Sequence, residues 1–252
     1  MINSGEIFGL KSLIQKRIKA INFSWFDMGN TKSLEFARKS LIDRNQPNIL
    51  EKENEAVWFT GEKVIKFSDD QNFISNRIKR SELLSEFTPK IIDKKENMYS
   101  YQFIKGKTLS KIINIPLFEE FLNFQKYFWF TFPVENKLNK KDFTSNCKKF
   151  YKDKTISRIK NFKNIYQLPK NLIINNEKFP DIFELLDNID WEYISEGIQV
   201  RFHGDLHFEN IIYNDIEKKF TILDWRQNFC NELLIGDIYY DLAKLLHGMI
   251  IS

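Results

Sequence analysis

The chain has 252 residues, of which 42% are hydrophobic, so it can bury a substantial core. Its net charge of +4 is small and spread along the sequence, which argues against a nucleic-acid partner. Two cysteines cannot staple a chain of this length, and no apolar run is long enough to cross a membrane. We therefore expect a cytoplasmic globular protein without a membrane or nucleic-acid partner.

The first part of the chain predicts helical pieces followed by a small sheet. Residues 1–44 are expected to be mostly helical. Alternating side chains predict strands at 56–60 and 63–67. Apolar residues at helical spacing predict a helix over 70–87, and residues 90–104 return to strand.

The second part is predominantly helical. A capped helix is expected to begin near Thr108, and helical spacing continues through 117–165 and again over 182–196. Residues 198–224 contain two strand-like runs around a loop, and a last helix is expected from near Asp237 to the end.

Strands with one helix, then helices with an embedded strand pair, predict an α+β protein of two lobes. We expect three parts: an N-terminal helical extension (1–47), a small nucleotide-binding lobe (48–105) and a catalytic lobe (106–252).

The strongest chemical signal is His203-Gly204-Asp205, followed by Asn210 and by Asp224 at the end of a hydrophobic run. Phosphoryl transfer needs a carboxylate to accept the proton of the acceptor hydroxyl, and hard oxygen ligands to hold Mg²⁺. Asp205 can supply the first, and Asn210 and Asp224 the second. The turn at 214–215 would return the strand of Asp224 to the loop.

The sequences HGDLHFEN and ILDW resemble the catalytic loop and metal motif of aminoglycoside phosphotransferases and choline or ethanolamine kinases. The resemblance implies a two-lobed protein kinase-like fold, with a small β-rich lobe and a mostly helical lobe. It also implies that Asp205 is the catalytic base and that Asn210 and Asp224 bind Mg²⁺. His203, which we group with Asp205, is similar to the loop histidine that braces the backbone.

Other residues resemble supporting parts of that site. In GDIYYDLAKLLHG, Asp241 is the best match to an aspartate that supports the catalytic loop, and Asp237 is the second. Lys66 in the run Val-Ile-Lys resembles the strand lysine that contacts the nucleotide phosphates. Glu82 is the favoured helix partner of Lys66, with Glu86 as the alternative.

Residues 99–109 resemble the connection between the lobes, where the backbone near Gln102 and Ile104 would meet the nucleotide base. One family feature is missing, because residues 49–62 contain a single glycine and no Gly-rich phosphate loop. Residues 137–163 are rich in lysine, and such a face either attracts an acidic or phosphorylated substrate or is simply solvated.

The two ends carry separate expectations. WFDMGNTKSLEFARK resembles the tail of sugar-phosphate nucleotidyltransferases, which would place the protein in surface or capsular polysaccharide synthesis. The chain stops soon after Asp241, whereas the family continues with further helices, so we expect a fragment.

Together these features predict an ATP- and Mg²⁺-dependent kinase that phosphorylates a hydroxyl of a small molecule: a sugar, an amino alcohol or an aminoglycoside. Two alternatives remain. One is a pseudokinase that only binds nucleotide, and the other is one part of a bifunctional nucleotidyltransferase–kinase.

Overall fold

The computed structural model describes residues 32–33, 54–167 and 172–251. Packing divides the chain into two units, Met1–Asn48 and Ile49–Ser252. The second unit contains both expected lobes, whereas the expected N-terminal helices and the nucleotidyltransferase-like stretch lie almost wholly outside the described residues. Within the described residues, none of the helices has the length and apolar character needed to cross a membrane.

The small lobe is a four-stranded antiparallel sheet with one helix. Its strand order is β1-β2-β4-β3, with β1 (Glu55–Thr60), β2 (Lys63–Ser68), β3 (Ile91–Lys95) and β4 (Met98–Gln102). Helix α3 (Gln71–Leu83) follows β2 and begins where Asp70 accepts a hydrogen bond from the backbone of Phe73.

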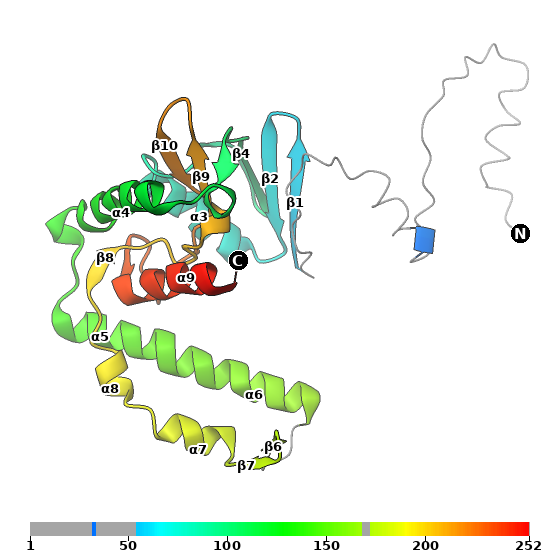
Figure 1. Ribbon diagram of the computed structural model, residues 1–252, viewed down its shortest axis with the longest axis vertical. Coiled ribbons are helices and arrows are strands. Elements are labelled where there is room, and N and C mark those ends of the chain that lie inside the picture. Colours follow the sequence, from blue (N-terminus) through cyan, green and yellow to red (C-terminus); the bar gives the residue numbers. More distant parts are fainter. Residues whose placement is uncertain (1–31, 34–53, 168–171, 252) are drawn as a thin grey trace, which may run out of the picture. The chain divides into compact units, whose positions relative to one another are not determined.

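The large lobe begins with β5 (Lys107–Thr108) and a 3₁₀ turn, η1 (Leu109–Lys111). The helices that follow are α4 (Ile115–Phe130), the 3₁₀ turn η2 (Val134–Asn136), α5 (Lys140–Lys148), the π-helical turn η3 (Lys149–Asp153) and α6 (Lys154–Tyr166). Figure 1 shows α5, η3 and α6 as one continuous helical rod.

The remaining elements of the large lobe are short until the last helix. They are β6 (Leu172–Ile174), β7 (Glu177–Phe179), α7 (Ile182–Asp187), α8 (Trp191–Ile194), β8 (Gln199–Arg201), η4 (Phe208–Asn210), β9 (Ile211–Asn214), β10 (Lys219–Ile222), β11 (Ile235–Asp237) and α9 (Ile238–Ile251). The pairings β8–β11 and β5–β9–β10 place the loop after β8 beside the end of β10.

One hydrophobic core joins the two lobes. It combines Val64 and Tyr99 of the small-lobe sheet with Phe121 of α4, Ile211 of β9 and Trp225, all nearly or fully buried. A second, aromatic core packs beneath the loop after β8, from Phe143, Cys147, Phe150, Phe202 and Phe229. Because both cores contact residues next to the motif, they fix its position in the fold.

Two expectations about the elements were wrong in detail, and two strand pairings were missed. The helix expected near Thr108 is only the turn η1, because α4 begins later, at the capping residue Asn114. The single helix expected over 182–196 breaks in two, since Asp190 accepts a hydrogen bond from Tyr193 and starts α8 anew. The hairpin β6–β7 and the pairing of β5 with β9 were not predicted.

Candidate active site

The loop between β8 and β9 is anchored by His203, whose side chain is fully buried. Its Nε2 atom lies 2.9 Å from the carbonyl oxygen of Leu223, and its Nδ1 atom accepts a 3.2 Å hydrogen bond from the backbone nitrogen of Asp205. Burial and the nearby charge of Arg80 lower the pKa of His203 to about 3, so the ring is neutral. Both ring nitrogens are thus engaged with the backbone, one with each of the two motifs.

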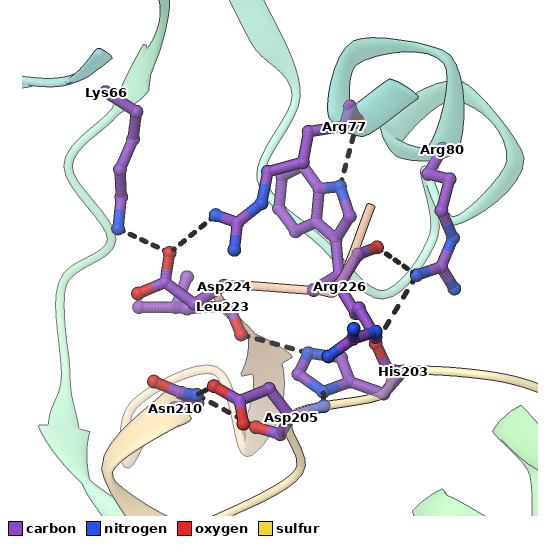
Figure 2. Close-up of polar contacts among 10 residues, drawn as sticks. Lys66, Arg77, Arg80, His203, Asp205, Asn210, Leu223, Asp224 and Arg226 are labelled. Carbon is purple, nitrogen blue, oxygen red and sulfur yellow. Dashed lines mark hydrogen bonds and ion pairs between the residues drawn. The ribbon is translucent and has the colours of Figure 1, made fainter. Parts of the chain in front are cut away.

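Backbone hydrogen bonds join this loop directly to the segment after β10. The amide of Leu223 donates to the carbonyl of Asn210 over 2.7 Å, and the amide of Arg226 donates to the carbonyl of His203 over 2.9 Å. Two stretches that are separate in sequence thus form one rigid surface, which carries Asp205, Asn210 and Asp224 (Figure 2).

Asp205 projects from this surface with its carboxylate next to Lys244 and His207. Its Oδ1 atom lies 2.9 Å from Nζ of Lys244 and 3.1 Å from Nε2 of His207. Burial raises the pKa of Asp205, but the hydrogen bond and charge of Lys244 outweigh this effect and lower it. The carboxylate is therefore ionised and able to accept a proton.

Asn210 points its amide nitrogen at Asp205. The Nδ2 atom donates to the backbone oxygen of Asp205 over 2.8 Å and lies 3.3 Å from Oδ2 of the same residue. Figure 2 shows that the amide oxygen is consequently turned away from Asp205. This oxygen is a hard donor of the kind that Mg²⁺ prefers.

Asp224 comes directly after Leu223 and has a left-handed backbone, with φ of +57°. Its Oδ1 atom contacts Nζ of Lys66 from β2 and lies 3.4 Å from the guanidinium of Arg77 on α3. Burial raises the pKa of this carboxyl, but Lys66 and then Arg77 overcome burial and hold it at about 2. Asp224 is thus an ionised carboxylate that contacts two basic side chains of the small lobe (Figure 2).

The expected pairing of Lys66 with Glu82 is wrong. The carboxylate of Glu82 lies 3.8 Å from Nζ of Lys94, and its side chain is 71% exposed. Five residues along a helix amount to a rotation of about 140°, so Glu82 faces solvent when Arg77 faces the site. Arg77 takes the position on α3 beside Asp224, with its charge opposite to the expected one.

Arg80, one turn after Arg77, is fully buried and connects α3 to the catalytic loop. Its guanidinium donates to the carbonyl oxygens of Phe202, His203 and Arg226, and its Nε atom donates to Leu233 over 2.6 Å. These four contacts replace the hydration that a buried cation loses. Burial nevertheless lowers the pKa of Arg80 to about 9.

Asp241, in the first turn of α9, supports the loop from the other side. Its carboxylate accepts hydrogen bonds from the backbone nitrogens of His203, over 2.9 Å, and Gly204, over 2.6 Å. Trp129 of α4 donates a third, over 3.1 Å. Asp237, the second candidate for this role, instead accepts a hydrogen bond of 2.5 Å from the hydroxyl of Tyr151.

Gln102 and Ile104 lie on the connection between the lobes and line a hollow of about 300 Å³. Figure 1 shows the hairpin β9–β10 beside this connection, and Asn214 and Thr221 of that hairpin form the other wall of the hollow. Gly106 permits the close approach, because a Cβ atom there would lie 2.5 Å from the carbonyl oxygen of Tyr213.

The donor set suits a hard divalent cation with nucleotide phosphates. The carboxylate of Asp224 and the amide oxygen of Asn210 are oxygen ligands, which are too few to enclose a metal but sufficient to share one with phosphate groups. Within the described ranges, no group of three His, Cys, Asp or Glu side chains is arranged to hold a metal ion.

Sequence reasoning missed four polar residues of the site: Arg77, Arg80, His207 and Lys244. Two of them carried a usable signal. His207 stands two residues after Asp205 within HGDLHFEN, and Lys244 is one helical turn after Asp241. The two arginines of α3 resemble ordinary surface residues in the sequence, and only the packing of α3 shows their role.

No protein-family model and no curated protein matches the sequence. The structure is similar to aminoglycoside phosphotransferase APH(3'')-Id from Streptomyces rimosus, with a TM-score of 0.50, 15% identity, and 79% of this chain and 76% of that chain covered. The streptomycin–ATP–APH(2'')-IIa ternary complex gives a TM-score of 0.48 at 14% identity, with 88% and 75% covered. Plasmodium vivax ethanolamine kinase gives 0.39 at 15% identity, with 98% and 74% covered.

The fold is therefore the two-lobed protein kinase-like fold of the aminoglycoside phosphotransferases, as the motifs led us to expect. At 15% identity the likeness concerns the fold, and the chemistry must be argued from the side chains of this chain.

Proposed function

We propose that this protein is an ATP- and Mg²⁺-dependent phosphotransferase that acts on a hydroxyl group of a small molecule. One observation carries the proposal. Two ionised carboxylates, Asp205 and Asp224, are fixed on one surface by backbone hydrogen bonds, and Lys66 reaches Asp224 from the other lobe. The fold, shared with a phosphotransferase, supports the same reading.

The residues divide the reaction between them. Asp205 would take the proton of the acceptor hydroxyl. The oxygen of that hydroxyl bonds to the γ-phosphorus of ATP, and the bond between this phosphorus and the oxygen of the departing ADP breaks. Asn210 and Asp224 would hold Mg²⁺, which neutralises phosphate charge when bound. Lys66 is assigned to the phosphates, and the backbone near Gln102 and Ile104 to the base. His203 and Asp241 position the loop through the backbone.

The test has two steps. Thermal-shift titration with ATP should stabilise the protein more strongly with Mg²⁺ present, and radiolabelled ATP should then transfer phosphate to a hydroxyl compound. Lack of any Mg²⁺-dependent ATP binding would refute the proposal. Tight binding without transfer or hydrolysis would instead support the pseudokinase alternative, which the presence of both carboxylates and Lys66 argues against.

A role in surface polysaccharide synthesis rests on the stretch WFDMGNTKSLEFARK alone. If this chain is one part of a bifunctional nucleotidyltransferase–kinase, the complete gene product should release pyrophosphate from a nucleoside triphosphate and a sugar phosphate. A complete protein without that activity would argue against this setting and leave the kinase proposal intact.

A further inference from the structure

Two basic side chains near the site, Lys154 and Arg226, have no role so far, and Lys244 has been described only through its contact with Asp205. Lys154, the first residue of α6, places its Nζ atom 4.3 Å from the centre of the Phe150 ring. The guanidinium of Arg226 lies 5.0 Å from the centre of the same ring. Lys244 of α9 contacts Asp205 directly, with 2.9 Å between Nζ and Oδ1.

Aromatic side chains connect these cations. Phe150 lies in the π-helical turn η3, and such turns are often found at functional sites. Tyr240 of α9 packs against Phe150, with ring centres 4.9 Å apart, and Lys154 lies 5.5 Å from the Tyr240 ring. The aromatic contacts therefore join the start of α6 to the face of α9 that carries Lys244.

Acidic partners are scarce around this cluster. In the part of the chain that the structure describes, neither Lys154 nor Arg226 forms an ion pair with a carboxylate, and Lys244 pairs only with Asp205. The Nε atom of Arg226 is buried without a hydrogen-bond partner. Asp153, next to Lys154 in sequence, is exposed. Positive charge is thus concentrated on the Asp205 side of the site.

This concentration is unfavourable in the absence of a ligand. Burial, together with the charges of Arg226, Arg158 and Lys244, lowers the pKa of Lys154 to about 7. Like charges in a partly buried site repel each other, and an arrangement of this kind is stabilised when an anion binds among them. Functional sites commonly contain such perturbed groups.

The position of the cluster indicates which substrate it serves. Lys66 and Arg77 contact Asp224, the carboxylate assigned to the metal and the nucleotide phosphates. Lys244 contacts Asp205, the carboxylate assigned to the acceptor hydroxyl. Lys154 and Arg226 are connected to Lys244 through Phe150 and Tyr240, so the cluster lies on the side of the site where the acceptor reacts.

We propose that the acceptor is an anionic hydroxyl compound, bearing a phosphate or a carboxylate, and that Lys154, Arg226 and Lys244 bind this anionic group beside Asp205. The inference rests on the proposed function, because it assigns the acceptor side from the role of Asp205. It also excludes polycationic acceptors such as aminoglycosides, which this cluster would repel.

The direct test is binding with the nucleotide site already filled. Wild-type protein is saturated with Mg²⁺ and a non-hydrolysable ATP analogue, and calorimetry then follows titration with glucose 6-phosphate, glucuronate, glucose or kanamycin. We expect the phosphate or the carboxylate probe to bind, glucose to bind more weakly and kanamycin not to bind. A preference between the two anions would distinguish a phosphorylated from a carboxylated acceptor.

Lys154→Met removes the charge but keeps the apolar stem against Phe150. It should weaken binding of the anionic probe by about tenfold, as expected for one lost charge-assisted hydrogen bond, and leave affinity for the ATP analogue unchanged. Lys160→Met is the matched control, since Lys160 lies on the same helix and is exposed. It should behave as wild type.

Each other outcome overturns the inference. It fails if kanamycin binds better than the anions, if neither anion binds beside the nucleotide, or if Lys154→Met leaves anion affinity intact. It also fails if Lys154→Met instead weakens binding of the ATP analogue, because Lys154 would then bind the nucleotide. If the ATP analogue does not bind wild type at all, the proposed function fails first, and this inference fails with it.

Discussion

The Oδ1 atom of Asp241 accepts a 2.6 Å hydrogen bond from the backbone nitrogen of Gly204, although the two residues are 37 positions apart. Gly204 has φ of +88°, and a Cβ atom at this position would lie 2.6 Å from Cβ of Arg226. The loop can therefore adopt this course only with glycine at 204 and with an acceptor at 241 for its buried amides.

We expect Asp241→Asn to lower kcat by about 10–100-fold, the range common for residues that support a functional group indirectly. The amide group of asparagine has one acceptor oxygen, so one of the amides of His203 and Gly204 would face an NH₂ group. Leaving a buried amide unpaired costs about 1–3 kcal/mol. Steady-state kinetics and urea unfolding measure both effects.

ATP affinity separates positioning from general damage in this variant. Asp241 contacts the loop and not the metal motif, so Kd for ATP should remain near the wild-type value. A variant that loses ATP binding in proportion to kcat would indicate that Asp241 acts through global stability alone. Asp237→Asn is a useful comparison, because Asp237 contacts Tyr151 and not the loop.

Asp205→Asn should remove turnover but retain nucleotide binding. The amide of asparagine cannot accept the proton of the acceptor hydroxyl, and loss of a positioned base commonly reduces the rate by about 10²–10⁴-fold. Single-turnover transfer measures the loss, and a thermal-shift titration with MgATP measures binding. A rate within threefold of wild type, roughly 0.6 kcal/mol, would remove Asp205 from its assigned role.

Asp224→Ala should weaken Mg²⁺-dependent ATP binding more than Asp205→Asn does. Asp224 is assigned to the metal, and its removal would also leave Lys66 and Arg77 without their shared carboxylate. The comparison is made between ATP dissociation constants at fixed Mg²⁺. Equal constants in the two variants would argue that Asp224 does not hold a metal.

Arg80→Met should destabilise the protein by several kcal/mol. It leaves the carbonyl oxygens of Phe202, His203 and Arg226 buried without this donor, at about 1–3 kcal/mol for an unsatisfied group. Arg80→Lys retains the charge but not the forked geometry, so it should recover only part of the stability. An Arg80→Met protein as stable as wild type would show that these contacts contribute little.

Affinity for an anionic acceptor should decrease as the pH rises through about 7. The pKa of Lys154 lies there in the ligand-free protein, lowered from 10.5 by burial and by Arg226, Arg158 and Lys244, with Cys230 acting in the opposite direction. A bound anion favours the charged form of the Lys154 amine. The protein must therefore take up a proton when an anion binds above pH 7. Arg226 keeps its charge in this range, so the loss should be partial.

Glucuronate is the suitable probe for this titration, because its carboxylate stays ionised across the whole range. Calorimetry in buffers of different ionisation enthalpy measures the proton uptake directly. Lys154→Met should abolish the dependence near pH 7. The same dependence in that variant would assign the titration to another group.

The motif could be recognised from the sequence because its residues are local. Asp205 and Asn210 share one loop, Asp224 follows a hydrophobic strand, and the turn between them predicts their return to one place. The small-lobe strands were also predictable, since alternation and a glycine turn are local properties.

The residues that surround the motif depend on tertiary packing. The rotation of α3 decides whether Glu82 or Arg77 faces the site. The core fixes this rotation through Ile74 and the buried Arg80. The cationic cluster could not be derived from the lysine-rich run at 137–163, because Lys154 meets Arg226 and Lys244 only through the packing of the fold. Its members come from three distant parts of the chain.

The contacts of α3 tie this helix to the large lobe. Arg80 binds four carbonyl oxygens of the large lobe, and the indole of Trp225 donates to the carbonyl of Arg77 over 2.9 Å. Helix α3 thus connects the small-lobe strands β2, β3 and β4, on which it packs, to the catalytic loop. Swinging this helix outward, a means by which protein kinases are switched off, would require the buried guanidinium to leave all its partners at once.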